Sequence, residues 1–204
     1  HHANNFIRHR KLFNGFKNIL KNILNWLFAI NFFYFQALFF KIRYLIKIMK
    51  EYEEKLRNYI KDNKIKAEQI IFENDVKTSK QAEVQTDNAL IVKTVVFVDL
   101  NKSLEYGNGV IAIVPSNSRV DRSKLRKKSD SKVKISSSEE VFILTSYPAG
   151  GVPPFGFKGR FYLDKSLENK DVVYAGGGSQ RTLIKTTIKE ILKANKAEVV
   201  NILE

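Results

Sequence analysis

The chain has 204 residues and a formal net charge of +14, from 35 Lys and Arg against 21 Asp and Glu, and it contains no cysteine. The absence of cysteine excludes disulfide frameworks, thiolate nucleophiles and cysteine-based metal sites. The composition is compatible with a cytosolic protein, so we expect a cytoplasmic location.

The first 48 residues differ in composition from the rest. They contain eight Lys and Arg but no Asp or Glu, and Phe, Ile, Asn, Lys, Leu and Tyr make up 36 of the 48. Codons of A and T alone can encode these six residue types. We therefore interpret residues 1–48 as translated upstream sequence that precedes a start at Met49. The alternative is a membrane-anchored interaction protein, because residues 23–40 are uncharged and long enough to span a bilayer.

Residues 49–204 have the length of one ordinary domain. All three histidines, His1, His2 and His9, precede this domain. Ser-His-Asp catalysis, Cys-His catalysis and zinc sites of His and Cys are therefore excluded within it. Its sequence has no clustered acidic motif, so we expect no metal and no other cofactor. Any chemistry would rely on Lys, Asp, Glu, Ser, Thr, Tyr, backbone amides, water or the substrate itself.

Short helices and strands alternate along the domain. Helical periodicity predicts a helix over 49–63, and a capping-box spacing at Thr78 and Gln81 predicts a second helix. Apolar, β-branched runs predict strands over 89–98, 109–115, 141–144, 161–163 and 172–175. A capping box at Thr187 and Glu190 predicts another helix, and the ending AEVVNIL predicts a last strand. We expect a single compact α+β domain with a curled, barrel-like mixed sheet flanked by short helices.

Lys93 interrupts the apolar run 89–98. An unpaired buried ammonium is costly, so this side chain must enter a polar cavity or reach the surface. One interpretation is a lysine on an edge strand that extends its ammonium to solvent. The other is a fixed cation that faces an anionic or carbonyl group of a ligand.

Seven of the ten glycines fall in two segments, TSYPAGGVPPFGFKG at 145–159 and AGGGSQ at 175–180. Glycine permits close approach of the backbone and positive φ, so clustered amides can line an anion or carbonyl site. Prolines in the first segment would hold it rigid before a ligand arrives. Neither segment matches a P-loop or GxGxxG. Each is typical of a structural turn when alone, whereas two of them together with Lys93 favour a ligand pocket.

Several stretches resemble the YbaK/ProX family of aminoacyl-tRNA deacylases, which includes the editing domain of many bacterial prolyl-tRNA synthetases. They are IVKTVVF at 91–97, SYPAGGVPPFG at 146–156, Asp164, VVYAGGGS at 172–179 and KAEVVNIL at 196–203. Their order and spacing agree with the family over residues 49–204. The resemblance implies a compact domain with a barrel-like sheet that hydrolyses amino acids wrongly attached to tRNA.

The resemblance also implies a set of functional residues. Lys93 matches the functional lysine of the family. The substrate-binding residues implied are Thr94, Gly150, Gly151, Pro154, Gly156, Gly176, Gly177, Gly178 and Ser179. We expect the loop amides to stabilise an oxyanion and Lys93 to hold the terminal adenosine or its phosphate. Water would attack the ester with help from a ribose hydroxyl.

The expected partner is the acceptor end of a mischarged tRNA, with an aminoacyl-tRNA synthetase as a second candidate. We expect no DNA partner, and a membrane only if residues 23–40 are an anchor. A non-catalytic tRNA- or nucleotide-binding module of the same fold is the alternative function.

Two further features bear on binding. Residues 118–134 contain eight Lys or Arg, which is typical of a solvated helix face or, alternatively, of a surface that contacts acceptor-stem phosphates. Tyr147, Phe155 and Phe157 lie near the first glycine segment. They either stack on the terminal base, shape the amino-acid pocket or pack in the core.

Overall fold

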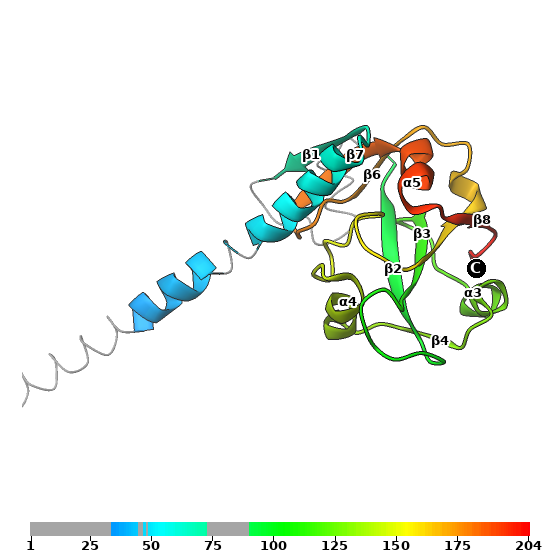
Figure 1. Cartoon of the computed structure of the whole chain (residues 1–204), viewed down its shortest axis with the longest axis horizontal. Helices are drawn as coiled ribbons and strands as arrows, with labels where there is room; N and C mark the ends of the chain where they lie inside the picture. The colour runs from blue at the N-terminus through cyan, green and yellow to red at the C-terminus, as the bar shows by residue number, and fades with distance from the viewer. Residues whose placement is uncertain (1–33, 45–46, 48, 73–89) are drawn as a thin grey trace, which may run out of the picture. The chain divides into compact units, whose positions relative to one another are not determined.

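The chain divides into two compact units, His1–Ile48 and Met49–Glu204. The computed structural model describes residues 34–44, 47, 49–72 and 90–204 (Figure 1). The second unit begins with a helix at residues 49–62, close to the predicted bounds. The elements that follow are β1 (Ala67–Ile71), β2 (Val92–Asp99), β3 (Val110–Pro115), α3 (Arg122–Ser129), β4 (Val133–Ile135), α4 (Ser138–Thr145), β5 (Arg160–Asp164), η1 (Lys165–Leu167), β6 (Val172–Gly176), β7 (Thr182–Thr187), α5 (Ile188–Asn195) and β8 (Glu198–Val200).

In the first unit, residues 34–44 are helical and their aromatic side chains are exposed. No helix within the described residues is both long and apolar enough to cross a membrane. Most of the candidate anchor at 23–40 lies outside the described residues. The helix predicted from Thr78 and Gln81 lies outside them as well.

The strands form two sheets. β1, β7 and β6 make an antiparallel sheet in that order, and β4, β2, β3, β5 and β8 make a mixed sheet. Among the described residues, one isolated parallel bridge, from Ile91 to Tyr174, joins β2 to β6. The predicted α+β class is confirmed. The expected curled, barrel-like sheet is wrong, because strand pairing between the two sheets is limited to this bridge and neither sheet is closed or strongly curled.

β2 and β3 are covered on both faces, which accounts for their nearly continuous apolar sequences. Successive side chains of a strand point to opposite faces. Val96, Ile111 and Ile113 therefore enter the larger core cluster, while Phe97 and Val110 enter the smaller one. The larger cluster also contains Leu56 and so holds the helix of residues 49–62 against the sheets. These strands provide a rigid base for the residues at their ends.

Residues 141–144 were predicted as a strand but belong to α4. Ser137 Oγ accepts a hydrogen bond from the N–H of Glu140, and the Glu140 carboxylate accepts one from the N–H of Ser137. This capping box satisfies two N–H groups that a helix start leaves without partners. The prediction was wrong because it followed the apolar run VFIL and overlooked the S-x-x-E pattern that precedes it.

The other predicted elements that fall on described residues are confirmed, with β2, β3, β5, β6, α5 and β8 at the expected places. Thr187 caps α5 by accepting a hydrogen bond from the N–H of Glu190. The sequence analysis missed β1, β4, β7 and α3. Helix α3, RSKLRKKS, has Leu125 as its only apolar residue, so it offers no apolar periodicity to detect.

Candidate functional site at the junction of the two sheets

Lys93 lies on β2 close to the bridge that joins the two sheets. It shares a face of the strand with Ile91, because residues two apart point to the same side. Ile91 forms the parallel bridge with Tyr174 of β6, and the Tyr174 N–H donates to the carbonyl of Leu90 at 2.9 Å. The predicted functional lysine therefore lies where β2 meets the strand that leads into the second glycine segment.

A small apolar cluster forms a wall beside Lys93. Ile91 and Leu183 are its buried members, and Phe72 and Tyr174 pack against it. Leu183 pairs in register with Gly176, the first glycine of the second segment. None of these four apolar residues was predicted to belong to the site. Strand alternation could have placed Ile91 there, but contacts between distant strands were needed for the others.

The Lys93 side chain is half-buried, and its Nζ donates a hydrogen bond to the carbonyl of Ser116 at 2.9 Å. Burial lowers the pKa of Lys93 from its ordinary value of 10.5, and the positive charge of Arg119 lowers it further. The side chain therefore does not simply extend into solvent. It is a cation held beside an apolar wall.

The edge of β2 opposite β3 is open at Thr94. β4 pairs with β2 only from Phe97 to Asp99. On this edge the carbonyl of Leu90 accepts a hydrogen bond from the N–H of Tyr174 of β6. The carbonyl of Val96 accepts one from the N–H of Ser136. In an antiparallel strand alternate residues direct their main-chain groups to the same side, so the N–H and C=O of Thr94 face this edge. No strand within the described ranges pairs with it there.

The Thr94 side chain lies on the face of β2 opposite to Lys93, together with Val92 and Val96 of the larger core cluster. Its Oγ1 is buried and has no hydrogen-bond partner among the described residues. The two neighbouring residues that were expected to bind substrate together are thus separated by the strand. Only the main chain of Thr94 faces the open edge near Lys93.

The two glycine segments pack against each other, backbone to backbone. A Cβ atom on Gly176 would lie 2.3 Å from the carbonyl oxygen of Val152, and one on Gly151 would lie 2.7 Å from the Cα of Ser179. The Gly178 N–H donates to the Gly151 carbonyl at 2.9 Å. Side chains at these positions would force the loops apart, so the glycines are required by close approach.

Three of the loop amides are already used in internal hydrogen bonds. Besides Gly178, the Gly151 N–H donates to Pro148 O at 3.0 Å and the Gly177 N–H donates to Thr182 O at 2.8 Å. In this structure these three amides donate within the protein and not to a ligand. The same bonds give the pair of loops a fixed shape.

Gly150 and Gly156 adopt positive φ, at +85° and +93°. Among the described residues, neither of their N–H groups has a hydrogen-bond partner. Pro154 is buried, and its carbonyl accepts a hydrogen bond from Asn195 Nδ2 at 2.9 Å. The amides of Gly150 and Gly156 are therefore not used within the loop, and Pro154 ties the loop to the end of α5.

Ser179 belongs to a buried network centred on Glu53, a residue that was not predicted. Glu53 is 3% exposed and accepts hydrogen bonds from Ser179 Oγ at 2.7 Å and Thr182 Oγ1 at 2.9 Å. It also forms an ion pair with Arg181, with Nε 3.0 Å from Oε1 and Nη2 3.2 Å from Oε2. This network joins the helix of residues 49–62 to the second glycine loop.

Burial raises the pKa of Glu53, but the hydrogen bonds from Arg181, Ser179 and Thr182 outweigh this effect, and the pKa lies below its ordinary value of 4.5. A carboxylate whose pKa is lower in the folded state stabilises the fold above its unfolded pKa. This stabilisation is lost as the pH falls through the folded pKa. The network is thus strongest near neutral pH.

We expect Glu53→Gln to lower the free energy of unfolding by about 2–4 kcal/mol at pH 7, because it leaves the Arg181 guanidinium without its charged partner. The difference from wild type should shrink as the pH falls below 4.5 and through the lowered pKa of folded Glu53, because the carboxylate is then lost. Urea unfolding at pH 7 and over a series of acidic pH values would measure it. Glu54→Gln is the matched control, since Glu54 is exposed on the same helix. Equal losses for both variants would contradict the proposed network.

The remaining predicted residues near the loops lie in the core. Tyr147, Phe155 and Phe157 are all buried in the larger cluster, which confirms that they pack in the core. Burial raises the pKa of Tyr147 above its ordinary value of 10. Asp164 is 2% exposed and accepts hydrogen bonds from the N–H groups of Ser166 and Ile202, so it joins β5 to the C-terminal segment.

The described residues contain no group of His, Cys, Asp and Glu side chains that could hold a metal ion. A shallow surface pocket of about 330 Å³ lies on the three-stranded sheet. Its lining residues are Lys66, Ala67, Glu68, Val172, Lys185, Thr186 and Thr187. None of the predicted site residues contributes to it.

Comparison with known proteins agrees with this geometry. The family model described as "Aminoacyl-tRNA editing domain" matches residues 73–194. The uncharacterized protein YwhH of Bacillus subtilis is 31% identical over 133 residues, which cover 62% of this chain and 85% of YwhH. The residues matched by the family model include Lys93 and both glycine loops.

Two solved structures have the same fold. The structure of hypothetical protein APE2540 matches with a TM-score of 0.66 and 25% identity, over 74% of this chain and 99% of that one. A proposed trans-editing enzyme for prolyl tRNA synthetase matches with a TM-score of 0.66 and 26% identity, over 75% of this chain and 97% of that one. With its fold, its lysine and its paired glycine loops, this chain belongs to the aminoacyl-tRNA editing domain family.

Proposed function

We propose that the chain is a trans-editing hydrolase that deacylates mischarged aminoacyl-tRNA. The observation that carries this proposal is the half-buried Lys93 at the junction of the two sheets, in a chain of the editing-domain family. A held cation beside an apolar wall suits a ligand that combines phosphate with a small or apolar group. The 3′ end of an aminoacylated tRNA is such a ligand.

The proposed reaction is hydrolysis of the ester that joins the amino acid to the terminal ribose. The oxygen of water bonds to the ester carbonyl carbon, and the bond from that carbon to the ribose oxygen breaks. The proton released by water ends on the ribose oxygen, with the neighbouring ribose hydroxyl as an aid. The products are the free amino acid and intact tRNA. Because the ester is activated, no covalent nucleophile of the protein is needed.

The described residues support distinct roles. Lys93 binds the terminal adenosine or its phosphate. The N–H groups of Thr94, Gly150 and Gly156 are the proposed donors to the developing oxyanion, and such a donor typically contributes about 3–4 kcal/mol. The other predicted residues act by keeping the two loops in shape. These are Gly151, Pro154, Gly176, Gly177, Gly178 and Ser179.

The first test uses the full chain and a set of tRNAs charged with non-cognate Ala, Ser, Cys or Pro. We expect at least one pair to release its amino acid about tenfold or more above the rate without protein, while correctly charged tRNA is spared. Release of free amino acid under multiple-turnover conditions is the readout. The pair that reacts identifies the amino acid and the tRNA.

The second candidate is a tRNA-binding module of the same fold without turnover. Retention of both Lys93 and the glycine loops favours the hydrolase. If no pair released its amino acid although the chain bound tRNA, the binding module would replace the hydrolase as the proposed function.

A further inference from the structure

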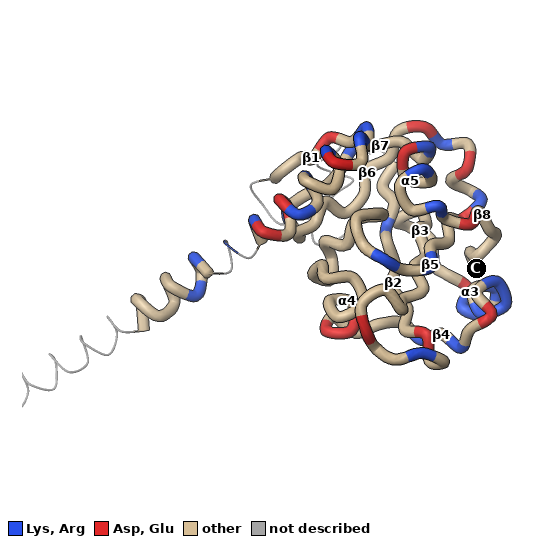
Figure 2. The backbone as a smooth tube through the Cα atoms, viewed as in Figure 1, with Lys and Arg blue, Asp and Glu red and all other residues tan. Residues whose placement is uncertain are grey.

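Helix α3 carries a dense group of positive charges. Five of its eight residues are exposed cations, namely Arg122, Lys124, Arg126, Lys127 and Lys128. Figure 2 shows this helix in blue beside the C-terminus. Among the described residues, its cations form one ion pair, between Lys124 and Asp121 at 4.0 Å. The charge of this surface is therefore largely uncompensated.

Helix stability accounts for only part of this charge. Arg126, Lys127 and Lys128 lie in the last turn, where cations interact favourably with the helix dipole. Arg122 lies in the first turn, where a cation is unfavourable, and the only acidic residue beside it is Asp121, the N-cap. Arg122 and Arg126 also form a like-charge pair at i,i+4, as do Lys124 and Lys128, and such pairs are destabilising.

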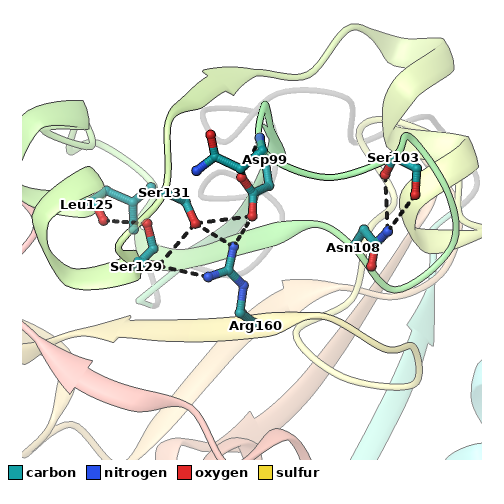
Figure 3. Close-up of polar contacts among 8 residues, drawn as sticks. Asp99, Ser103, Asn108, Leu125, Ser129, Ser131 and Arg160 are labelled. Carbon is teal, nitrogen blue, oxygen red and sulfur yellow. Dashed lines mark hydrogen bonds and ion pairs between the residues drawn. The ribbon is translucent and has the colours of Figure 1, made fainter.

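The helix is fixed to the domain from its other side. Leu125 is fully buried. The carbonyl of Ser129 accepts a hydrogen bond from Arg160 Nη1 at 2.8 Å, and Arg160 in turn forms an ion pair with Asp99 at the end of β2 (Figure 3). Ser131 Oγ bridges the Arg160 guanidinium and the Asp99 carboxylate. A rigid support thus presents the basic side of α3 to solvent.

This basic surface is connected to the candidate site by a short loop. Lys93 Nζ donates to the carbonyl of Ser116, and the chain continues from there through exposed Arg119 to Asp121, the N-cap of α3. The charge of Arg119 reaches Lys93, since it lowers the pKa of that lysine. The positive charges therefore continue from Lys93 through Arg119 to α3.

We propose that Arg119 and the exposed cations of α3 bind the phosphates of the tRNA acceptor stem while the aminoacylated end lies at Lys93. The identity of the RNA rests on the proposed function. A lipid surface fits less well, because the apolar residue of α3, Leu125, is buried and cannot insert. A single strand also fits less well, because α3 has no aromatic side chain for base stacking. The phosphate backbone of double-stranded RNA is the ligand that matches this surface.

The test compares two triple variants of the full chain that lose the same charge. One is Arg122→Gln, Lys127→Gln and Lys128→Gln on α3. The control is Lys61→Gln, Lys170→Gln and Lys189→Gln, three exposed lysines on other elements. The probes are an uncharged tRNA transcript and an RNA hairpin of about 12 base pairs that reproduces an acceptor stem. Binding is measured between about 50 and 200 mM salt.

We expect the α3 variant to bind both RNAs at least tenfold more weakly at about 100 mM salt than the control. The slope of log affinity against log salt should become shallower by about 2–3, as expected for three lost phosphate contacts. The single variant Arg122→Gln should weaken RNA binding but keep or raise the melting temperature, because it removes a cation from the first turn of a helix. If the role of Arg122 were purely structural, the variant would lose RNA affinity and melting temperature together.

Equal affinities and salt slopes for the two triple variants would overturn the proposal. It would also be wrong if vesicles of phosphatidylserine competed with the hairpin as well as unlabelled hairpin does at equal phosphate concentration. The binding assay uses uncharged RNA and requires no turnover. The RNA-binding result can therefore be interpreted even if no aminoacyl-tRNA is hydrolysed. The proposed hydrolase function and the proposed RNA-binding surface can each be wrong without the other.

Discussion

Replacing Lys93 by alanine should lower kcat/KM for deacylation by about 10- to 150-fold, because a hydrogen bond to a charged group contributes about 1.5–3 kcal/mol to binding. The free energy of unfolding should stay the same or rise. The lowered pKa of Lys93 means that folding disfavours its ammonium form, so removing the charge relieves that cost. Loss of activity with retained stability would separate a functional role from a structural one.

The same lowered pKa predicts the pH dependence of activity. If the ammonium is the form that binds the substrate, kcat/KM should fall as the pH rises through the pKa of Lys93, at a pH below the ordinary value of 10.5. Lys93→Gln, which keeps a donor but no charge, should lose this alkaline decrease. Rates must be corrected for spontaneous ester hydrolysis, which increases with pH.

The measurement is single-turnover release of the amino acid from the tRNA pair that reacts with wild type, together with urea unfolding of each variant. Lys189→Ala is the control, because Lys189 is exposed on α5 and its loss removes the same charge. A Lys93→Ala chain that kept the wild-type rate would show that the central role proposed for this lysine is wrong. A parallel loss of stability would point to a structural role through the bond to Ser116.

Replacing Gly176 by alanine should have the largest structural effect of any glycine substitution in the two loops. The added Cβ would lie 2.3 Å from the carbonyl oxygen of Val152 and 2.9 Å from its carbonyl carbon. These atoms are backbone, so they cannot move aside as a flexible side chain can. We expect a loss of about 3 kcal/mol or more in the free energy of unfolding, typical of severe overpacking.

Gly150→Ala provides the comparison, because its Cβ would meet only the flexible side chain of Gln180, at 3.5 Å. Its cost comes from the positive φ of +85° and should be about 1–2 kcal/mol. Urea unfolding and deacylation assays of both variants would test this order. Similar stabilities for the two would contradict the tight packing of Gly176 against the first loop.

Deacylation by Gly176→Ala should fall further than its stability alone explains. The clash would separate the second glycine segment from the first, and the shape of the first loop determines where the Gly150 and Gly156 amides lie. The comparison is made at a temperature at which both variants are fully folded. Wild-type kcat in folded Gly176→Ala would mean that the contact between the loops does not serve the site.

Local sequence patterns were sufficient for the first helix of the domain, the central strands and α5. The central strands β2 and β3 could be predicted because a long β-branched run is favourable in few other structures. Lys93 could be singled out because a charge in such a run is costly in any fold. α4 was mistaken for a strand and α3 was missed because short helices depend on caps and tertiary contacts more than on apolar periodicity.

The sequence by itself determined the α+β class and was enough to single out Lys93 and the two glycine segments as candidates, because each follows from residues that are neighbours in the chain. Only the tertiary structure decided that the strands form two sheets, that Thr94 presents its main chain and not its side chain near Lys93, and that three loop amides are already bonded. It also revealed Glu53, which lies 126 residues from its partner Ser179. Such contacts join segments far apart in sequence, and no local pattern encodes which of them meet.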